Sequence, residues 1–202
     1  MNIYAAVFLG VLASNAFGQT SPEVIRLVQP QPTETPGRIE VIEFFWYGCP
    51  HCNTLEPLLE AWEKGLPGDV VLRRVPVIWR GRDETGLHAR LFLTLQSMDL
   101  LPGYHRAVFE TLHGAKQRIR NDRQVVEWAA SQGIERSMFD AAYRSSGVRA
   151  QWLRTRNITR DYQVESVPSF AVNGKFWVKV HDERAVFATL DELIAAERPK
   201  KP

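Results

Sequence analysis

Hydrophobic positions in the first part of the chain alternate between runs typical of strands and repeats typical of helices. Residues 39–47 read IEVIEFFWY, an almost continuous apolar and aromatic run that is typical of a strand covered on both faces. Pro50 then takes the first position of a predicted helix, whose leucines recur at helical spacing until Gly65. A second predicted strand covers 70–79. The order strand, helix, strand predicts a βαβ unit.

The remainder of the chain is helical in pattern before it returns to strands. Apolar residues spaced by three and four predict helices over most of 83–147, one of them capped by Ser137, and a further helix over 148–162. Residues 169–180 contain two strand-like runs joined by Asn-Gly, which predicts a hairpin. A last helix follows. The pattern predicts an α/β fold in which a helical segment interrupts a sheet-forming unit.

The two ends of the chain complete the expected organisation. Residues 1–18 carry no charged side chain, and their short apolar run followed by small residues is typical of a cleaved secretory signal peptide. The Pro- and Gln-rich character of 19–38 predicts an extended lead-in. We expect an exported, soluble protein with a sheet-forming domain at 39–82 and 148–198, a helical insertion at 83–147 and a tail at 199–202.

Composition and charge narrow the possible functions. The 202 residues, 45% of them apolar, suffice for a hydrophobic core and exclude a disordered or collagen-like chain. A net charge of +2 gives no indication of a nucleic-acid partner. Because Cys49 and Cys52 are the only cysteines, the chain is not a small domain held together by several disulfides.

Cys49 and Cys52 form a C-x-x-C pair at the start of the first predicted helix. The unpaired N–H groups and the positive end of the helix dipole favour a thiolate at Cys49, and the thiolate is the nucleophile in thiol–disulfide exchange. Cys52 lies one turn further in, where it can resolve a mixed disulfide formed at Cys49. A purely structural disulfide across so short a loop would constrain the unfolded chain little. The pair therefore predicts redox chemistry.

At this point a family resemblance becomes specific. The run FFWYGCPHC at 44–52 and the run SVPSF at 166–170, just before the hairpin, resemble the DsbA family of periplasmic thiol:disulfide interchange proteins. The resemblance covers the whole predicted mature chain. It implies a thioredoxin fold, in which a mixed central sheet is flanked by helices and carries an inserted all-helical subdomain.

The resemblance also implies roles for individual residues. Cys49 is expected to be the attacking cysteine, and Pro50 and His51 are expected to tune its acidity. A protonated His51 would place a positive charge beside the sulfur. Pro168 is expected to follow a cis peptide bond, which would turn the backbone of Val167 so that an extended client strand can pair with it.

Two acidic residues match the family pattern as well. Glu43 lies six residues before Cys49, and Glu56 lies seven after it. A buried proton-handling role is the functional interpretation of both. The alternatives are that Glu43 faces an edge of the sheet or forms an ion pair with Arg73 or Arg74, and that Glu56 is a solvated helix residue.

The function implied by the family is the introduction of disulfide bonds into exported proteins. The enzyme would donate its Cys49–Cys52 disulfide through a mixed disulfide, act as a monomer and need no other cofactor. Its clients would be unfolded or folding exported proteins with free thiols. A quinone-linked membrane reoxidase similar to DsbB would restore the disulfide in the periplasm.

Two other functions remain open at this stage. A disulfide isomerase or reductase of the same fold is the first, although isomerases of this kind usually carry a dimerisation domain, for which 19–38 is too short. The second is a metal-binding module using Cys49, His51 and Cys52, which would need further ligands. The other histidines show no ligand spacing beside a cysteine and are expected to be solvated or hydrogen-bonded: His88, His105, His113 and His181.

Overall fold

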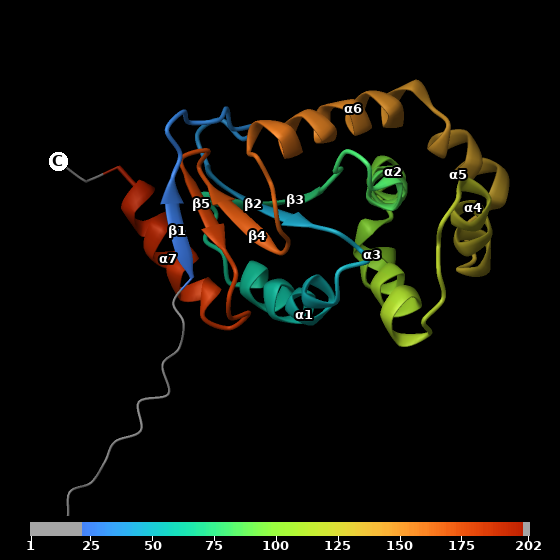
Figure 1. Cartoon of the computed structure of the whole chain (residues 1–202), viewed down its shortest axis with the longest axis horizontal. Coiled ribbons are helices and arrows are strands. Elements are labelled where there is room, and N and C mark those ends of the chain that lie inside the picture. The colour runs from blue at the N-terminus through green and yellow to red at the C-terminus, as the bar shows by residue number, and fades with distance from the viewer. Residues whose placement is uncertain (1–21, 200–202) are drawn as a thin grey trace, which may run out of the picture.

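A computed structural model describes residues 22–199, so the predicted signal peptide and the end of the predicted tail lie outside the described residues. At its centre lies a mixed sheet in the order β1-β5-β4-β2-β3 (Figure 1). β2 and β3 are parallel, and the other three pairings are antiparallel. The strands are β1 (Glu23–Arg26), β2 (Ile39–Phe45), β3 (Val70–Pro76), β4 (Ser169–Val172) and β5 (Phe176–Lys179).

Helices flank this sheet and also form a separate subdomain beside it (Figure 1). Three helices pack near the sheet: α1 (Pro50–Lys64), α6 (Ser146–Asp161) and α7 (Val186–Glu197). The inserted subdomain contains α2 (Asp83–Ser97), α3 (Leu101–Phe109), the π-helical turn η1 (Glu110–Gly114), α4 (Asp122–Ser131) and α5 (Arg136–Tyr143). This is the predicted α/β architecture with a helical insertion. Between residues 22 and 199, no helix is both long and apolar enough to cross a membrane.

β2 is the strand that positions the rest of the core. All seven of its residues are buried, as the apolar run predicts. Val41 packs in one hydrophobic cluster with α1 and α7, whereas Ile42 and Phe44 pack in another on the opposite face of the sheet. Side chains alternate along a strand. Glu43 therefore shares the face of Val41, toward α1, and Glu40 shares the opposite face.

A third hydrophobic cluster joins the sheet to the helical subdomain. It contains Phe45 and Tyr47 at the end of β2 together with both cysteines. From the subdomain it includes Phe92 of α2 and Phe109 of α3, and these two rings contact Phe45 edge-on and at a tilt. The start of α1 is therefore held where the two parts of the molecule meet.

The structure corrects the predicted cap of one inserted helix. Glu135, not Ser137, caps α5: its carboxylate accepts hydrogen bonds from two backbone N–H groups, at 3.0 and 2.8 Å. The helix ends at Tyr143, and Ser145 then caps α6. A carboxylate satisfies more of the unpaired N–H groups at a helix start than a single hydroxyl can, so the earlier residue takes the position.

The described part of the predicted lead-in, residues 22–38, takes part in the sheet. Its β1 pairs with β5, where Val24 lies opposite Val178. Further on, the backbone N–H of Gln31 donates a 2.8 Å hydrogen bond to the carbonyl of Gly174 at the tip of the β4–β5 hairpin. The lead-in therefore follows the sheet edge.

The hairpin has the Asn-Gly turn that the sequence predicts. Asn173 and Gly174 have φ angles of 51° and 66°, both in the left-handed region that a type I′ turn requires. A Cβ atom on Gly174 would also collide with the carbonyl of Gln31. Glycine is therefore required here by both conformation and space.

We expect Gly174→Ala to lower the free energy of unfolding by at least about 1–2 kcal/mol, because alanine resists the left-handed region and meets Gln31. Urea denaturation followed by circular dichroism measures this change. Gly103→Ala in α3 is the matched control, since nothing lies within 4 Å of its added Cβ. Helix propensity predicts a gain of about 0.5–1 kcal/mol for that control. Equal losses in the two variants would contradict the prediction.

Candidate active site

The cysteine pair lies at the first turn of α1, as the sequence predicts. Cys49 is the N-cap residue with extended backbone, and Pro50 occupies the first turn of the helix, where a missing N–H costs nothing. Both cysteines are free thiols and both are buried, but Cys52 is fully enclosed whereas Cys49 retains 8% exposure. A client can therefore reach the sulfur of Cys49 more readily.

The Val167–Pro168 segment faces the cysteine pair. The peptide bond between these two residues is cis, as the resemblance implies. The thiol of Cys49 donates to the carbonyl of Val167 at 3.5 Å across 118 residues of sequence. Pro168 itself is buried and Val167 is half-buried. The structure therefore brings together the two motifs that the sequence analysis linked.

The two thiols differ strongly in acidity. The pKa of Cys49 is lowered from 9.0 to about 6, first by a hydrogen bond from the Cys52 thiol and then by the backbone N–H groups of Cys52 and His51 and by the charge of His51, against an opposing effect of burial. The pKa of Cys52 is raised well above 9.0, mainly by burial and then by its bond to Cys49. Cys49 is therefore the sulfur that ionises.

His51 lies on the surface beside Cys49, where its side chain is 75% exposed. Its Nδ1 lies 3.0 Å from a carboxylate oxygen of Glu183, in the loop before α7, and this hydrogen bond raises the pKa of His51 above 6.5. A protonated His51 favours the Cys49 thiolate. Glu183 was not identified from the sequence, because 132 residues separate it from His51 and it belongs to no motif.

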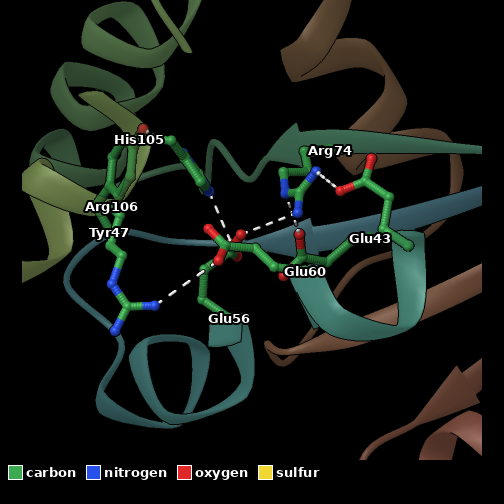
Figure 2. Close-up of polar contacts among 8 residues, drawn as sticks. Glu43, Tyr47, Glu56, Glu60, Arg74, His105 and Arg106 are labelled. Atoms are coloured by element: carbon green, nitrogen blue, oxygen red, sulfur yellow. Dashed lines mark hydrogen bonds and ion pairs between the residues drawn. The ribbon is translucent and has the colours of Figure 1, made fainter. Parts of the chain in front are cut away.

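A buried charged cluster connects β2, β3 and α1 (Figure 2). Glu43 and Arg74 are register partners on β2 and β3, with Arg74 Nε 3.6 Å from Glu43 Oε2. The same guanidinium contacts Glu56 and Glu63 of α1, each at 2.9 Å. The sequence analysis named Arg73 and Arg74 as possible ion-pair partners of Glu43, and the structure shows that the partner is Arg74. Glu56 is not solvated but buried.

The helical subdomain contributes to this cluster through α3. His105 Nε2 lies 3.4 Å from Glu56 Oε2, and its Nδ1 lies 2.6 Å from the hydroxyl of Tyr47 (Figure 2). At the edge of the cluster, Arg106 of α3 and Glu60 of α1 form an ion pair at 3.7 Å. His105 is buried and hydrogen-bonded, as one of the two expectations for the histidines had it. The spacing of residues along the sequence gave no indication of its contact with Glu56.

The pKa values of Glu43 and Glu56, the two buried carboxyls of the cluster, are shifted in opposite directions. Burial raises the pKa of Glu43 well above 4.5, and the charge of Glu56 adds to this more than Arg74 offsets it. Burial also acts to raise the pKa of Glu56, but its contacts with His105 and Arg74 outweigh that effect and lower it. The surroundings therefore favour the ionised form of Glu56 and the protonated form of Glu43.

Metal binding finds no support in this geometry. Within the part of the chain that the structure describes, no three side chains of the His, Cys, Asp and Glu types are placed to hold a metal ion together. His51 turns to Glu183 at the surface, and the two cysteines lie inside.

Comparison with known proteins agrees with this geometry. The family model described as "DSBA-like thioredoxin domain" matches residues 40–191. The chain is 35% identical over 179 residues to the thiol:disulfide interchange protein DsbA of Pseudomonas aeruginosa, covering 87% of this chain and 84% of that protein. It is 34% identical over 200 residues to the Bordetella parapertussis protein of the same name, covering 96% and 92% of the two chains.

Solved structures give the same result. The crystal structure of Pseudomonas aeruginosa DsbA superposes with a TM-score of 0.82 at 34% identity, over 88% of this chain and 93% of that one. The oxidoreductase DsbA from Xylella fastidiosa gives 0.80 at 26% identity, over 87% and 95%. Sequence and structure therefore indicate one family.

We expect Cys52→Ala to raise the pKa of Cys49 by about 1–2 pH units, because a hydrogen bond to a charged group is lost. The ultraviolet absorbance of the thiolate, followed through a pH titration, measures it. Cys52→Ser is the matched control, since its hydroxyl can still donate. The same pKa in both variants would show that the hydrogen bond is not the main cause.

We expect Glu183→Gln to lower the pKa of His51 toward 6.5, because the variant loses the carboxylate that favours the imidazolium. NMR titration of the His51 ring signals measures it. Glu192→Gln on α7 removes the same charge at an exposed position away from His51 and should leave the His51 titration unchanged. An unchanged His51 titration in Glu183→Gln would contradict the assignment.

Proposed function

Because the chain belongs to the DsbA family of thioredoxin-fold enzymes, we propose that its Cys49–Cys52 disulfide oxidises client dithiols by the residue roles described below. The chain is a thiol:disulfide oxidoreductase that introduces disulfide bonds. The observation that carries the proposed roles is the opposite acidity of its two thiols at one helix start.

The reaction begins with the more exposed sulfur. A client thiolate attacks Sγ of Cys49, which forms the mixed disulfide and breaks the bond to Cys52. A second client thiolate then attacks the client sulfur of the mixed disulfide and releases Cys49 as a thiolate. Two electrons have passed from the client dithiol to the enzyme. The client dithiol gives up its two protons to solvent, Cys49 leaves as a thiolate, and Cys52 gains one proton from a group of the enzyme that solvent later reprotonates.

Glu43 is the proposed source of the proton for Cys52. Burial makes both the thiolate of Cys52 and the carboxylate of Glu43 unfavourable, and the negative charge of Glu43 is one of the causes that raise the pKa of Cys52. Transfer of a proton from Glu43 to Cys52 as the sulfur leaves would prevent a second buried anion. Arg74, which contacts Glu43 and Glu56, then stabilises the carboxylate that remains.

The low pKa of Cys49 makes the disulfide a better oxidant. With a pKa of about 6 in place of 9.0, roughly nine-tenths of Cys49 is thiolate at pH 7. This stabilises the reduced enzyme by about 1.4 kcal/mol, which corresponds to about 30 mV for a two-electron couple. The same shift also stabilises the folded reduced enzyme: the gain grows from pH 6 to pH 9.0, is complete above pH 9.0, and is lost as the pH falls through 6.

Val167 and Pro168 are the proposed client-binding residues. The Val167 carbonyl lies against the attacking sulfur, and a client strand in extended form can pair with this backbone segment. Main-chain pairing needs no particular client side chain. This suits an enzyme with many unfolded clients.

Family membership and the N-terminal sequence support a proposed setting for the reaction. We place the protein in the periplasm after removal of residues 1–18 and expect it to act there as a monomer on exported proteins with free thiols. A quinone-linked membrane protein similar to DsbB would reoxidise it. The Cys49–Cys52 disulfide would be its redox group, with no added cofactor.

Single-turnover oxidation of a dithiol peptide tests the roles of the site residues. Oxidised Glu43→Gln should form the mixed disulfide more slowly than the unaltered protein, on the order of a hundredfold, because a general acid is lost. Quenched samples separated by mass measure the rate. Glu40→Gln is the control, since it changes the other buried carboxyl of β2 on the opposite face. Equal rates in the unaltered protein and Glu43→Gln would remove Glu43 from the mechanism.

Stability provides a second readout for Glu43. A carboxyl whose pKa is raised by folding makes the folded state less stable as the pH rises from its unfolded value toward its folded one. Glu43→Gln lacks this loss. Its stability relative to the unaltered protein should therefore increase from pH 4 to pH 8 in urea denaturation.

A further inference from the structure

A large groove lies between the sheet-forming domain and the helical subdomain. Its volume is about 1260 Å³. Its walls are the loop at 78–83, helix α2, helix α6 and the segment 163–165 that leads to the cis peptide bond. Figure 1 shows α6 running from the sheet to the helical subdomain, with α2 beneath its far end. None of the residues assigned to the redox site lines the groove.

The groove concentrates positive charge. Six arginines line it against three carboxylates, an excess of three, whereas the whole chain has a net charge of only +2. The arginines are Arg80, Arg82, Arg90, Arg149, Arg156 and Arg160. Lys200 and Lys201 alone supply this net charge of +2, so residues 22–199 are neutral in sum and the positive excess of the groove is offset by a negative excess of three elsewhere.

Most of these guanidinium groups are available to a ligand. Arg90 lies 3.9 Å from Asp122, and Arg160 contacts Asp161. The other four arginines are exposed and form no ion pair within residues 22–199. Positive charges held near one another in excess of the nearby carboxylates repel each other, and an anionic ligand would reduce that repulsion.

Aromatic rings hold two of the available guanidinium groups over the groove. Arg82 lies 4.9 Å from the ring centre of Trp79, and Arg156 lies 5.5 Å from that of Trp152. The rings are themselves fixed, because each indole N–H donates to a backbone carbonyl, of Val164 at 2.6 Å and of Gly86 at 2.8 Å. A stacked guanidinium keeps its edge free for a carboxylate.

The groove ends close to the reacting sulfur. Val164, which accepts the bond from Trp79, precedes Val167 by three residues, a span of at most about 10 Å along the chain. The carbonyl of Val167 contacts Cys49. An extended polypeptide whose cysteine is bound at Cys49 can therefore reach the groove with the residues next to that cysteine.

From this arrangement we propose that the arginine groove is a second client-binding site, which takes segments rich in Asp and Glu beside the reacting cysteine. The proposal rests on the proposed function, because it assigns to the clients of that same site a preference in sequence. Arginine pairs well with carboxylates. A polypeptide fits better than a small anion, since the charges extend over two helices and a loop that adjoin the client-binding backbone.

Kinetics with matched peptides test the proposal. Two dithiol peptides share the same cysteine region, and one carries a run of Glu and Asp where the other carries Gln and Asn. The acidic peptide should have a KM about tenfold lower, at similar kcat, because several exposed ion pairs contribute together. Added salt should remove the difference. Equal KM values at low salt would overturn the proposal.

Charge-matched variants locate the effect. Arg80→Gln, Arg149→Gln and Arg156→Gln combined should abolish the preference for the acidic peptide and leave the neutral peptide unaffected. The control combines three exposed arginines elsewhere, Arg118→Gln, Arg123→Gln and Arg136→Gln, for the same change in net charge. Loss of the preference in the control as well would show a general charge effect and overturn the groove as the site.

A binding measurement separates this proposal from the proposed function. The acidic peptide without cysteines should shift the indole N–H signals of Trp79 and Trp152 in NMR spectra of the unaltered protein. The signal of Trp62, on α1 beside α7, should not move. Binding without oxidation of either dithiol peptide would contradict the redox roles alone. Oxidation of both peptides without indole shifts would contradict the groove alone.

Discussion

The hydrogen bond from the buried Cys52 thiol to Cys49 is the interaction on which the chemistry of this protein depends. It requires one sulfur to remain protonated and the other to ionise, although the two lie in the same helical turn. The two thiols differ in pKa mainly because Cys52 is the more deeply buried: the helical subdomain and the end of β2 enclose it fully. The insertion therefore has a chemical role: it excludes water from one of two otherwise similar thiols.

The sequence was most informative where the local structure is determined by residues that are adjacent in the chain. The cysteine pair at the start of α1, the Asn173–Gly174 turn and the buried strand β2 follow from a few adjacent residues. The cap of α5 was predicted wrongly because two residues two positions apart can both cap a helix, and spacing does not decide between them. The cis bond before Pro168 needed the family resemblance, since an isolated proline gives no such signal.

Contacts between distant segments could not be predicted. Glu183 and His105 meet site residues only after the hairpin and the helical subdomain have packed, and neither lies in a recognisable pattern. Glu56 is an acidic residue in an amphipathic helix, which normally indicates exposure, but Arg74 and His105 satisfy it in the interior. The arginine groove likewise depends on α2 and α6 lying side by side, whereas the arginines of α6 alone indicate only a solvated face.

The alternation of side chains along β2 has a consequence for how such chains diverge. Glu40 and Glu43 are both buried, but their positions differ by three, an odd number, so they occupy opposite faces of the sheet. Insertion or deletion of a single residue between Glu43 and the cysteines would rotate the carboxyl away from α1 while the CPHC tetrapeptide stayed intact. A homologue with that change would keep the CPHC motif and lose the proposed proton donor, so under the proposed mechanism the length of this spacer marks an active paralogue better than the tetrapeptide does.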